Sequence, residues 1–189
     1  MMPINNLGDG MGEGLCYWIT GLPGAGKTTL ATALLLELRK SGVPAALLDG
    51  DGLRGGLCSD LGHSDADRRE NIRRASAVAR LMADSGLTVV CAFVSPFEAD
   101  RQLARRQFAP GIFVEIYLNT ALEECVRRDP KKLYARAQAG ELKGLTGWDA
   151  PYEAPASPAF VFDTRSTTVG AMVALLMGQP PMRPAGAGA

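Results

Sequence analysis

Gly21-Leu22-Pro23-Gly24-Ala25-Gly26-Lys27-Thr28 is the stretch that decides the fold, because it matches the pattern G-x-x-x-x-G-K-[ST] at every fixed position. Residues 15–20 before it form a short apolar run typical of a buried strand, and residues 27–40 after it carry leucines at helical spacing. A glycine-rich turn between a strand and a helix directs backbone N–H groups inward, and the helix N-terminus adds partial positive charge. The stretch therefore predicts a P-loop that binds the phosphates of a nucleoside triphosphate.

The same motif predicts what its side chains do. Lys27 is expected to reach the β and γ phosphates of ATP, and the Thr28 hydroxyl is expected to ligate Mg²⁺. The alternative, a chance glycine turn, does not account for the strand and helix that flank it. Backbone contacts to the phosphates are expected from Gly21, Gly24, Ala25, Gly26 and Thr29.

Strands alternate with helices along the rest of the chain. This pattern predicts a three-layer α/β fold of the P-loop NTPase type, nucleoside-kinase-like, with a mostly parallel sheet covered on both faces. We expect residues 15–178 to form one kinase domain, after a flexible lead-in (1–14) and before a flexible tail (179–189). The further strands are predicted at residues 45–48, 87–94, 112–118 and 160–162, and the further helices at 65–85, 97–106, 120–128 and 167–177.

Composition excludes several functional classes. Apolar residues make up 47% of the 189, as in a globular domain, and 20 basic residues balance 20 acidic ones. A general nucleic-acid binder would carry a basic excess, and a membrane span needs roughly 18 consecutive apolar residues. The four cysteines are far apart and form no C-x-x-C pair, so we expect reduced thiols in a cytoplasmic protein.

Polar residues follow two of the predicted strands at their carboxyl ends, where parallel sheets bind ligands. Asp49 and Asp51 come after the second strand; one of them could take a proton from an acceptor hydroxyl or hold water on the magnesium, or both could simply build an Asp-Gly turn. Ser95 and Pro96 end the central strand. They either face the acceptor or only terminate the strand.

Two further segments are candidates for acceptor binding. The helix sequence DRRENIRR (residues 67–74) either grips an anionic acceptor through its arginines or forms a solvated face paired with Glu70. Residues 129–148 are too long for a plain loop, and we interpret them as a lid that excludes water from the reaction; the alternative is a surface excursion. His63, the only histidine, is expected to be a polar surface group.

With these motifs in place, the chain resembles the adenosine 5′-phosphosulfate kinase family from about residue 17 to residue 164. The segments that carry the resemblance are YWITGLPGAGKTTLA, DGD, ENIRR, SPF-x-x-DR, DP-K-x-LY, AGE-x-K-G-x-TG and PYEAP. The resemblance implies ATP-dependent phosphorylation of the ribose 3′-hydroxyl of adenosine 5′-phosphosulfate, with 3′-phosphoadenosine 5′-phosphosulfate and ADP as products. It also implies a homodimer in the cytoplasm that serves sulfate assimilation.

The resemblance also implies roles for individual residues. Asp51 would activate the acceptor hydroxyl with support from Asp49, and Ser95 matches the serine that the family associates with phosphate, so Lys27, Asp49, Asp51 and Ser95 are the expected catalytic residues. Arg128 would bracket the adenine of ATP, and residues 131–147 would form the mobile lid. Residues expected to contact the acceptor are Asp51, Arg54, His63, Arg68, Asn71, Ser95, Pro96, Lys131 and Leu145.

The chain departs from the family pattern where the acceptor's base would lie. His63 and Leu145 stand where the family has two phenylalanines, and Lys132 and Trp148 are unusual in the lid. Stacking of a base on an aromatic ring is worth roughly 1–3 kcal/mol, so this change bears directly on the choice of acceptor. Two other functions therefore stay open: a related kinase for another nucleotide, such as a cytidine diphosphate derivative, or a small hydroxyl compound, and an inactive nucleotide-binding partner of a sulfurylase. The survival of Lys27 and other transfer residues argues against the inactive form.

Overall fold

The computed structural model describes residues 14–178 and contains a five-stranded parallel sheet in the order β2-β3-β1-β4-β5. All four strand pairings are parallel, as the alternation of strands and helices predicts. Of the predicted flexible segments, residues 1–13 and 179–189 lie outside the described residues, whereas Gly14 is buried and donates its N–H to the Ala83 carbonyl. The strands are β1 (Cys16–Gly21), β2 (Ala45–Asp49), β3 (Thr88–Ala92), β4 (Phe113–Leu118) and β5 (Phe160–Phe162).

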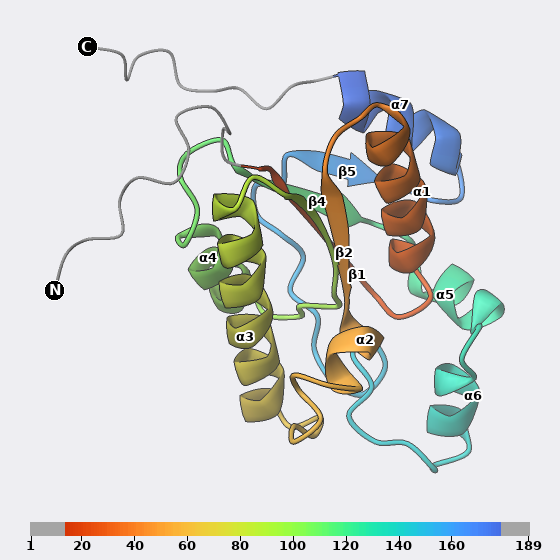
Figure 1. Ribbon diagram of the computed structural model, residues 1–189. Coiled ribbons are helices and arrows are strands. Elements are labelled where there is room, and N and C mark those ends of the chain that lie inside the picture. Colours follow the sequence, from red (N-terminus) through yellow and green to blue (C-terminus); the bar gives the residue numbers. More distant parts are fainter. Residues whose placement is uncertain (1–13, 179–189) are drawn as a thin grey trace, which may run out of the picture.

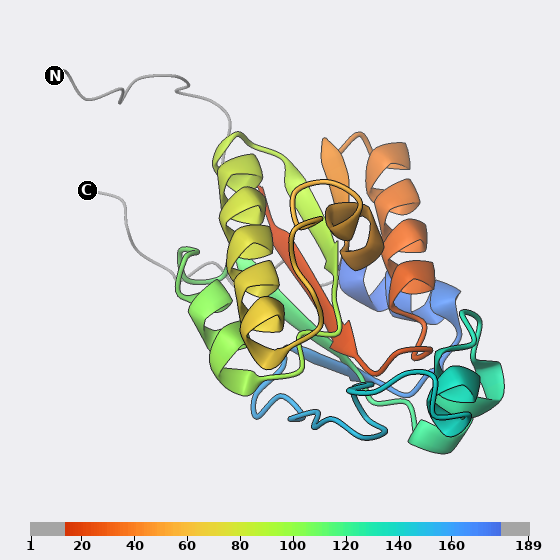
Figure 2. The same cartoon turned by 90° about the horizontal axis from the view of Figure 1, so that it is seen from below.

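Helices cover both faces of this sheet, which makes three layers. Figures 1 and 2 show α1 and α7 on one side of the sheet and α3 and α4 on the other. The fold class predicted from the sequence is thereby confirmed. The helices are α1 (Lys27–Lys40), α2 (Gly50–Arg54), α3 (Asp65–Asp84), α4 (Glu98–Arg105), α5 (Leu122–Arg128), α6 (Leu133–Gln138) and α7 (Val169–Gly178).

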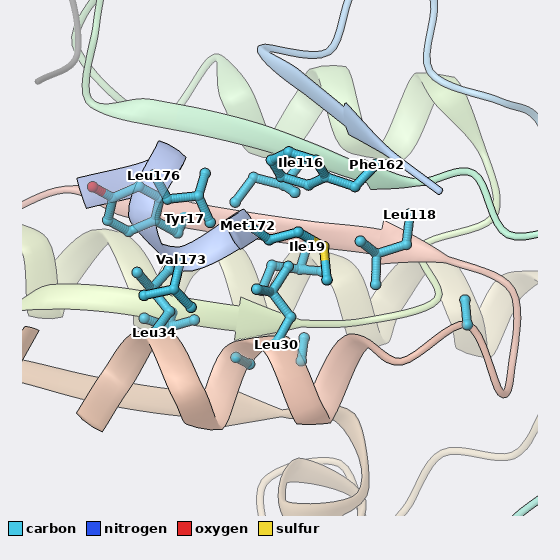
Figure 3. Packing of buried hydrophobic residues seen from close by; sticks show 14 of the residues in the cluster. Tyr17, Ile19, Leu30, Leu34, Ile116, Leu118, Phe162, Met172, Val173 and Leu176 are labelled. Carbon is cyan, nitrogen blue, oxygen red and sulfur yellow. The ribbon is translucent and has the colours of Figure 1, made fainter. Parts of the chain in front are cut away.

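The central strand β1 is buried on both faces because its side chains alternate between two apolar layers. Tyr17 and Ile19 belong to the core under α1 and α7, whereas Cys16 and Trp18 belong to the core under α3 and α4. Figure 3 shows the first of these cores, in which residues of β1, α1 and α7 meet. Burial of this strand fixes the position of the P-loop that follows it.

Strand register brings the candidate site residues to one edge of the sheet. Gly21 at the end of β1 pairs with Leu118 at the end of β4, and Asp49 at the end of β2 pairs with Ala92 at the end of β3. The carboxyl ends of the strands therefore form a common rim. This is the edge where ligands bind in open parallel sheets.

The sequence patterns missed two short helices, α2 and α6. Helix α2 follows β2 directly, and the Asp49 carboxylate caps it by accepting the Asp51 N–H at 2.9 Å. Helix α6 lies inside the predicted lid, where the Asp129 carboxylate accepts the N–H groups of Tyr134 and Ala135. Both helices are shorter than two turns, too short to give an apolar period that sequence reasoning detects. Among residues 14–178, no helix is long and apolar enough to cross a membrane.

Candidate active site

A single pocket of about 810 Å³ opens along the carboxyl edge of the sheet. It runs from the P-loop past α2 to α3, and the predicted lid segment (residues 129–148) lines its outer side. Every site residue expected from the sequence lines this pocket, apart from Gly21 and Ala25. Residues that the sequence analysis did not single out but that also line it include Ile72, Phe93, Leu133, Tyr134, Leu142 and Thr146.

The P-loop glycines adopt conformations that other residues rarely take. Gly21, Gly24 and Gly26 have φ angles of 150°, 79° and 101°, in the region that glycine enters without strain. A Cβ at Gly24 would also lie 2.9 Å from the Cys125 carbonyl oxygen. The loop therefore requires glycine at this position both for its backbone conformation and for its close approach to α5.

Lys27 occupies the centre of the P-loop. Its Nζ donates to the carbonyl oxygens of Gly21 and Leu22, each at 2.8 Å. Desolvation by the surrounding protein lowers the pKa of this ammonium group to about 8. The carbonyl oxygens hold the charge in place until an anion with more negative charge, such as a triphosphate, replaces them.

The side chains expected around a magnesium ion form a compact oxygen cluster. Thr28 Oγ1 donates to Asp49 Oδ2 at 2.9 Å, and Asp49 Oδ1 fixes the start of α2, which carries Asp51. Hydroxyl and carboxylate oxygens are the donors that Mg²⁺ takes, together with water and phosphate. Asp51 itself forms an ion pair with Lys131 of the lid segment.

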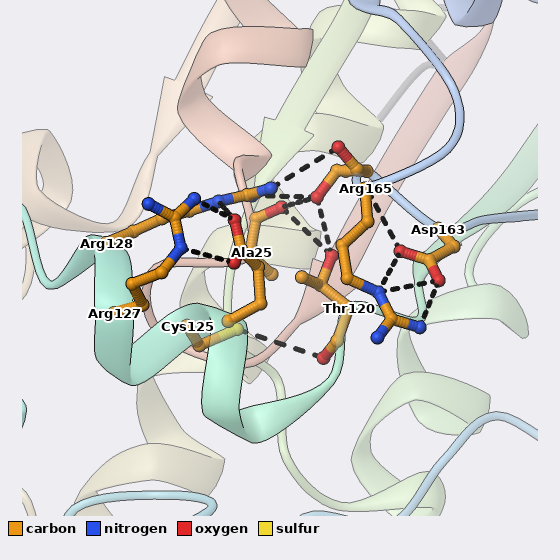
Figure 4. A network of polar contacts seen from close by, with 9 residues as sticks. Ala25, Thr120, Cys125, Arg127, Arg128, Asp163 and Arg165 are labelled. Atoms are coloured by element: carbon orange, nitrogen blue, oxygen red, sulfur yellow. Dashed lines mark hydrogen bonds and ion pairs between the residues drawn. The ribbon is translucent and has the colours of Figure 1, made fainter.

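Arg128, at the end of α5, lies beside the P-loop. Its guanidinium donates to Thr164 Oγ1 at 2.7 Å and to the Glu124 carboxylate at 2.7 Å. Thr164 Oγ1 in turn donates to the Ala25 carbonyl at 3.3 Å, which links the arginine to the nucleotide loop. Figure 4 shows Arg128 and Ala25 within this polar network. Arg128 is thus held in one orientation on the nucleotide side of the pocket.

The opposite side of the pocket is basic. Arg54 donates to the Gly62 carbonyl at 2.8 Å, and Arg68 donates to the His63 carbonyl at 2.9 Å. Asn71 is buried, and its Oδ1 has no hydrogen-bond partner among the described residues. An unpaired buried oxygen is unfavourable, so this end of the pocket favours a ligand that is anionic and also offers a donor.

His63 and Leu145, which are expected beside the nucleobase of the acceptor, differ in their surroundings. His63 is exposed, and the pKa of its imidazole is lowered by partial burial and by the positive charges of Arg54 and Arg68. The ring is therefore neutral at pH 7 and offers a flat face for stacking. Leu145 is only 7% exposed and packs against the core, while its N–H donates to Asp149.

The hydroxyl of Ser95 is turned toward the protein. Ser95 Oγ accepts from Trp18 Nε1 at 3.2 Å and donates to Thr20 Oγ1 at 2.9 Å. The residue lines the pocket but is only 2% exposed, and its φ of 38° lies in the left-handed region. The sequence left both a ligand contact and a strand terminator open, and the partners that engage the hydroxyl could not be read from it.

Arg73 and Arg74, the last two arginines of the α3 motif, face away from the site. Arg73 pairs with Glu70, and Arg74 pairs with both Glu70 and Asp60. Neither lines the pocket. For these two residues the interpretation as a solvated face paired with Glu70 is confirmed.

The lid segment is anchored to the P-loop by a residue that the sequence analysis missed. Tyr134 is buried, and its hydroxyl donates to the Pro23 carbonyl at 2.9 Å. Farther along, Gly147 lies so close to the P-loop that a Cβ would meet Leu22 Cδ2 at 2.4 Å. An aromatic pair, Tyr134 and Trp148, within an otherwise polar stretch was the available signal for this packing.

Comparisons with known proteins agree with this geometry. The family model described as "Adenylylsulphate kinase" matches residues 13–163. A protein of Marinobacter nauticus named "Adenylyl-sulfate kinase" is 53% identical over 80% of this chain and 76% of its own, and one of the same name from Citrobacter koseri is 50% identical over 87% and 82%. The solved structure of the Mycobacterium tuberculosis APS kinase in complex with AMPPNP and APS has a TM-score of 0.85 at 43% identity, covering 88% of this chain and 97% of that chain.

Proposed function

The chain belongs to the adenylylsulphate kinase family, and we propose that it transfers the γ-phosphate of ATP to the ribose 3′-hydroxyl of adenosine 5′-phosphosulfate (APS). One observation carries the proposal: the P-loop lines the same pocket as the basic residues Arg54 and Arg68 and the neighbouring Asn71. A relative with the same fold is described in complex with an ATP analogue and APS, which supports two nucleotides in one such pocket.

The nucleotide side supplies binding and charge. The P-loop amides and Lys27 would hold the phosphates, and Arg128 would lie against the adenine. Thr28 and Asp49 would hold Mg²⁺, which neutralises charge on the transferring phosphoryl group when it is bound. Phosphoryl transfer needs little covalent chemistry from the protein, so these groups act mainly by position and charge.

The acceptor side of the pocket supplies a general base and two arginines that bind an anion. Asp51 would take the proton of the 3′-hydroxyl, because its carboxylate stands at the start of α2 between the Thr28–Asp49 pair and the lid. Arg54 and Arg68 would hold the phosphosulfate, and His63 and Leu145 would cover the two faces of the adenine. Ser95 and Pro96 would shape the corner of the pocket beside the acceptor.

The lid segment would exclude water while the phosphoryl group moves. Lys131 on this segment reaches Asp51, and Arg68 reaches Gly144 and Thr146. A closed lid keeps ATP from being hydrolysed by solvent. The position of Lys131 beside Asp51 supports a role in stabilising charge on the phosphates.

A coupled assay of ADP release tests the function. We expect turnover with ATP, Mg²⁺ and micromolar APS, and none after Lys27→Ala or Asp51→Asn, with Arg73→Gln as the matched control outside the pocket. A small panel of other nucleotides, including cytidine diphosphate derivatives, would be assayed beside APS. Phosphorylation of a cytidine diphosphate derivative but not of APS would show that His63 and Leu145 have changed the acceptor. Absence of turnover on every nucleotide in the panel would contradict the kinase itself.

We also propose that the enzyme is a cytoplasmic homodimer. All four cysteines are buried free thiols, as in proteins of reducing compartments. Leu81 on α3 and Leu103 on α4 are 67% and 58% exposed, and a second copy would cover them. Light scattering is expected to give twice the chain mass, and Leu81→Asp with Leu103→Asp is expected to give the monomer.

A further inference from the structure

A network of three hydroxyl groups, those of the buried Thr20 and Ser95 and the half-buried Tyr152, connects three parts of the site. Thr20, the last residue before the P-loop glycine Gly21, accepts a hydrogen bond from Ser95 Oγ at 2.9 Å. Its own hydroxyl donates to the Val94 carbonyl at 2.7 Å and lies 3.0 Å from the hydroxyl of Tyr152. Thr20 therefore joins the end of β1 to the segment after β3, and Tyr152 joins both to the segment that follows the lid.

The direction of every hydrogen bond in this hydroxyl network is determined by the two groups at its ends, Trp18 and the Val94 carbonyl. The Trp18 indole N–H only donates, and the Val94 carbonyl only accepts. The Ser95 hydroxyl accepts a hydrogen bond from Trp18 and donates one to Thr20, and the Thr20 hydroxyl donates to the Val94 carbonyl. The proton between Thr20 and Tyr152 must then come from Tyr152, so the tyrosine hydroxyl is a donor and Thr20 has both lone pairs engaged.

The ring of Tyr152 is held independently of its hydroxyl. It stacks on Tyr117 with centroids 6.0 Å apart, and the Arg101 guanidinium lies 5.8 Å from its centroid. Arg101, which is fully buried, also donates to the carbonyl oxygens of Ser95 and Glu153, each at 2.6 Å. Removal of the hydroxyl alone would therefore leave the ring in place and remove the hydrogen bond to Thr20.

We propose that Tyr152 is a positioning residue for the phosphoryl transfer. Through its hydrogen bond to Thr20 it fixes the positions of the P-loop and of Ser95 relative to the lid segment. The inference rests on the proposed function, because it concerns the geometry between the two bound substrates. The hydroxyl touches neither the nucleotide loop directly nor the Arg54 and Arg68 cluster. Its loss is expected to disturb transfer to the acceptor and to leave nucleotide binding intact.

Tyr152→Phe tests this inference, with Tyr117→Phe as the matched control. Both substitutions remove one tyrosine hydroxyl from the same stacked pair, but the Tyr117 hydroxyl donates to Asn119 and not to Thr20. Thr20→Val removes the hydroxyl that accepts the hydrogen bond from Tyr152, and Thr20→Ser retains that hydroxyl. For each variant we would measure acceptor phosphorylation, ADP release without acceptor, the Kd for ATP and the thermal midpoint.

For Tyr152→Phe we expect kcat for acceptor phosphorylation to fall about tenfold, the order that loss of one buried hydrogen bond produces. ADP release without acceptor and the Kd for ATP should stay within about twofold. Thr20→Ser should keep the activity, and Tyr152→Phe should add nothing to Thr20→Val.

The inference is overturned if Tyr152→Phe keeps full activity, or if Tyr117→Phe loses as much. It is also overturned if the loss follows the thermal midpoint alone, or if the effects of Thr20→Val and Tyr152→Phe simply add. ADP release without acceptor needs no assumption about the acceptor. A wild-type enzyme that releases ADP but does not phosphorylate APS would therefore refute the proposed acceptor and not the role of Tyr152. The same variants would then be compared on the nucleotide of the panel that the enzyme does phosphorylate.

Discussion

ATP binding is expected to weaken as the pH rises from 7 to 9, because Lys27 loses its proton in the ligand-free enzyme. Desolvation lowers the pKa of this residue to about 8, and its Nζ donates to the carbonyl oxygens of Gly21 and Leu22, which carry no formal charge. A bound triphosphate places negative charge beside the ammonium group, which raises its pKa. The nucleotide therefore binds the protonated form more tightly.

The size of the effect follows from the pKa of about 8. The protonated fraction of Lys27 in the free enzyme is about 90% at pH 7 and about 10% at pH 9. If only the protonated form binds, the Kd for ATP rises about tenfold over this interval, which is about 1.4 kcal/mol. Binding takes up about 0.1 proton at pH 7 and about 0.9 proton at pH 9.

Isothermal titration calorimetry measures both quantities. Mg²⁺-ATP would be titrated at pH 7, 8 and 9 in two buffers with different enthalpies of ionisation, and the difference in heat gives the proton uptake. Above pH 7 the phosphates of ATP are largely ionised, so their titration contributes little. Lys27→Arg is the control, because a guanidinium keeps its charge throughout this range.

A Kd that stays constant between pH 7 and 9 would refute the reasoning. So would an equal tenfold change in Lys27→Arg, since the titrating group would then lie elsewhere. A proton uptake that is largest at pH 7 would mean that the group responsible has a pKa well below the value that desolvation gives to Lys27.

Three further outcomes are expected. Gly147→Ala would place a Cβ 2.4 Å from Leu22 Cδ2 at a φ of +85°, so kcat measured by ADP release should fall at least about tenfold, with binding of ATP retained. Tyr134→Phe removes the bond to the Pro23 carbonyl, and limited proteolysis of the lid segment should become faster, whereas an unchanged rate would contradict the anchoring. His63 is the only histidine, so proton NMR should give a single imidazole midpoint, below 6.5 because of burial and the neighbouring arginines, and an anionic acceptor should move it upward.

The fold and the nucleotide side of the site could be predicted from sequence because their signals are local. The P-loop pattern spans eight residues, and the strand before it and helix after it read directly from apolar spacing. Even the short strand β5 was found, since Phe160–Phe162 is a run of three bulky apolar residues that ends at Asp163. Helix α6 was not found, because its start depends on a carboxylate cap from Asp129 and on the packing of Tyr134 against the P-loop.

Contacts between distant residues could not be predicted from the same patterns. Ser95 offers its hydroxyl to partners that lie 75 and 77 positions earlier in the chain, so nothing near it in the sequence shows that the proton is already engaged. Tyr152 is 132 positions from Thr20, and the motif that contains it, PYEAP, gives no sign of a hydroxyl tie. Sequence reasoning therefore identified which residues gather at the pocket but not which of them keep a free donor for a ligand.

The ion pair between Lys131 and Asp51 shows why the site can be closed and still ready to bind. Lys131 covers the carboxylate that we propose as the base, and a permanent pairing of this kind would block catalysis. Both side chains are more than half exposed, however, and exposed ion pairs contribute only about 0–1 kcal/mol. A triphosphate carries more charge than one carboxylate and would draw Lys131 away at little cost. We therefore expect the nucleotide to free the proposed base, so ATP should accelerate modification of Asp51 by a carboxyl-directed carbodiimide when no acceptor is present.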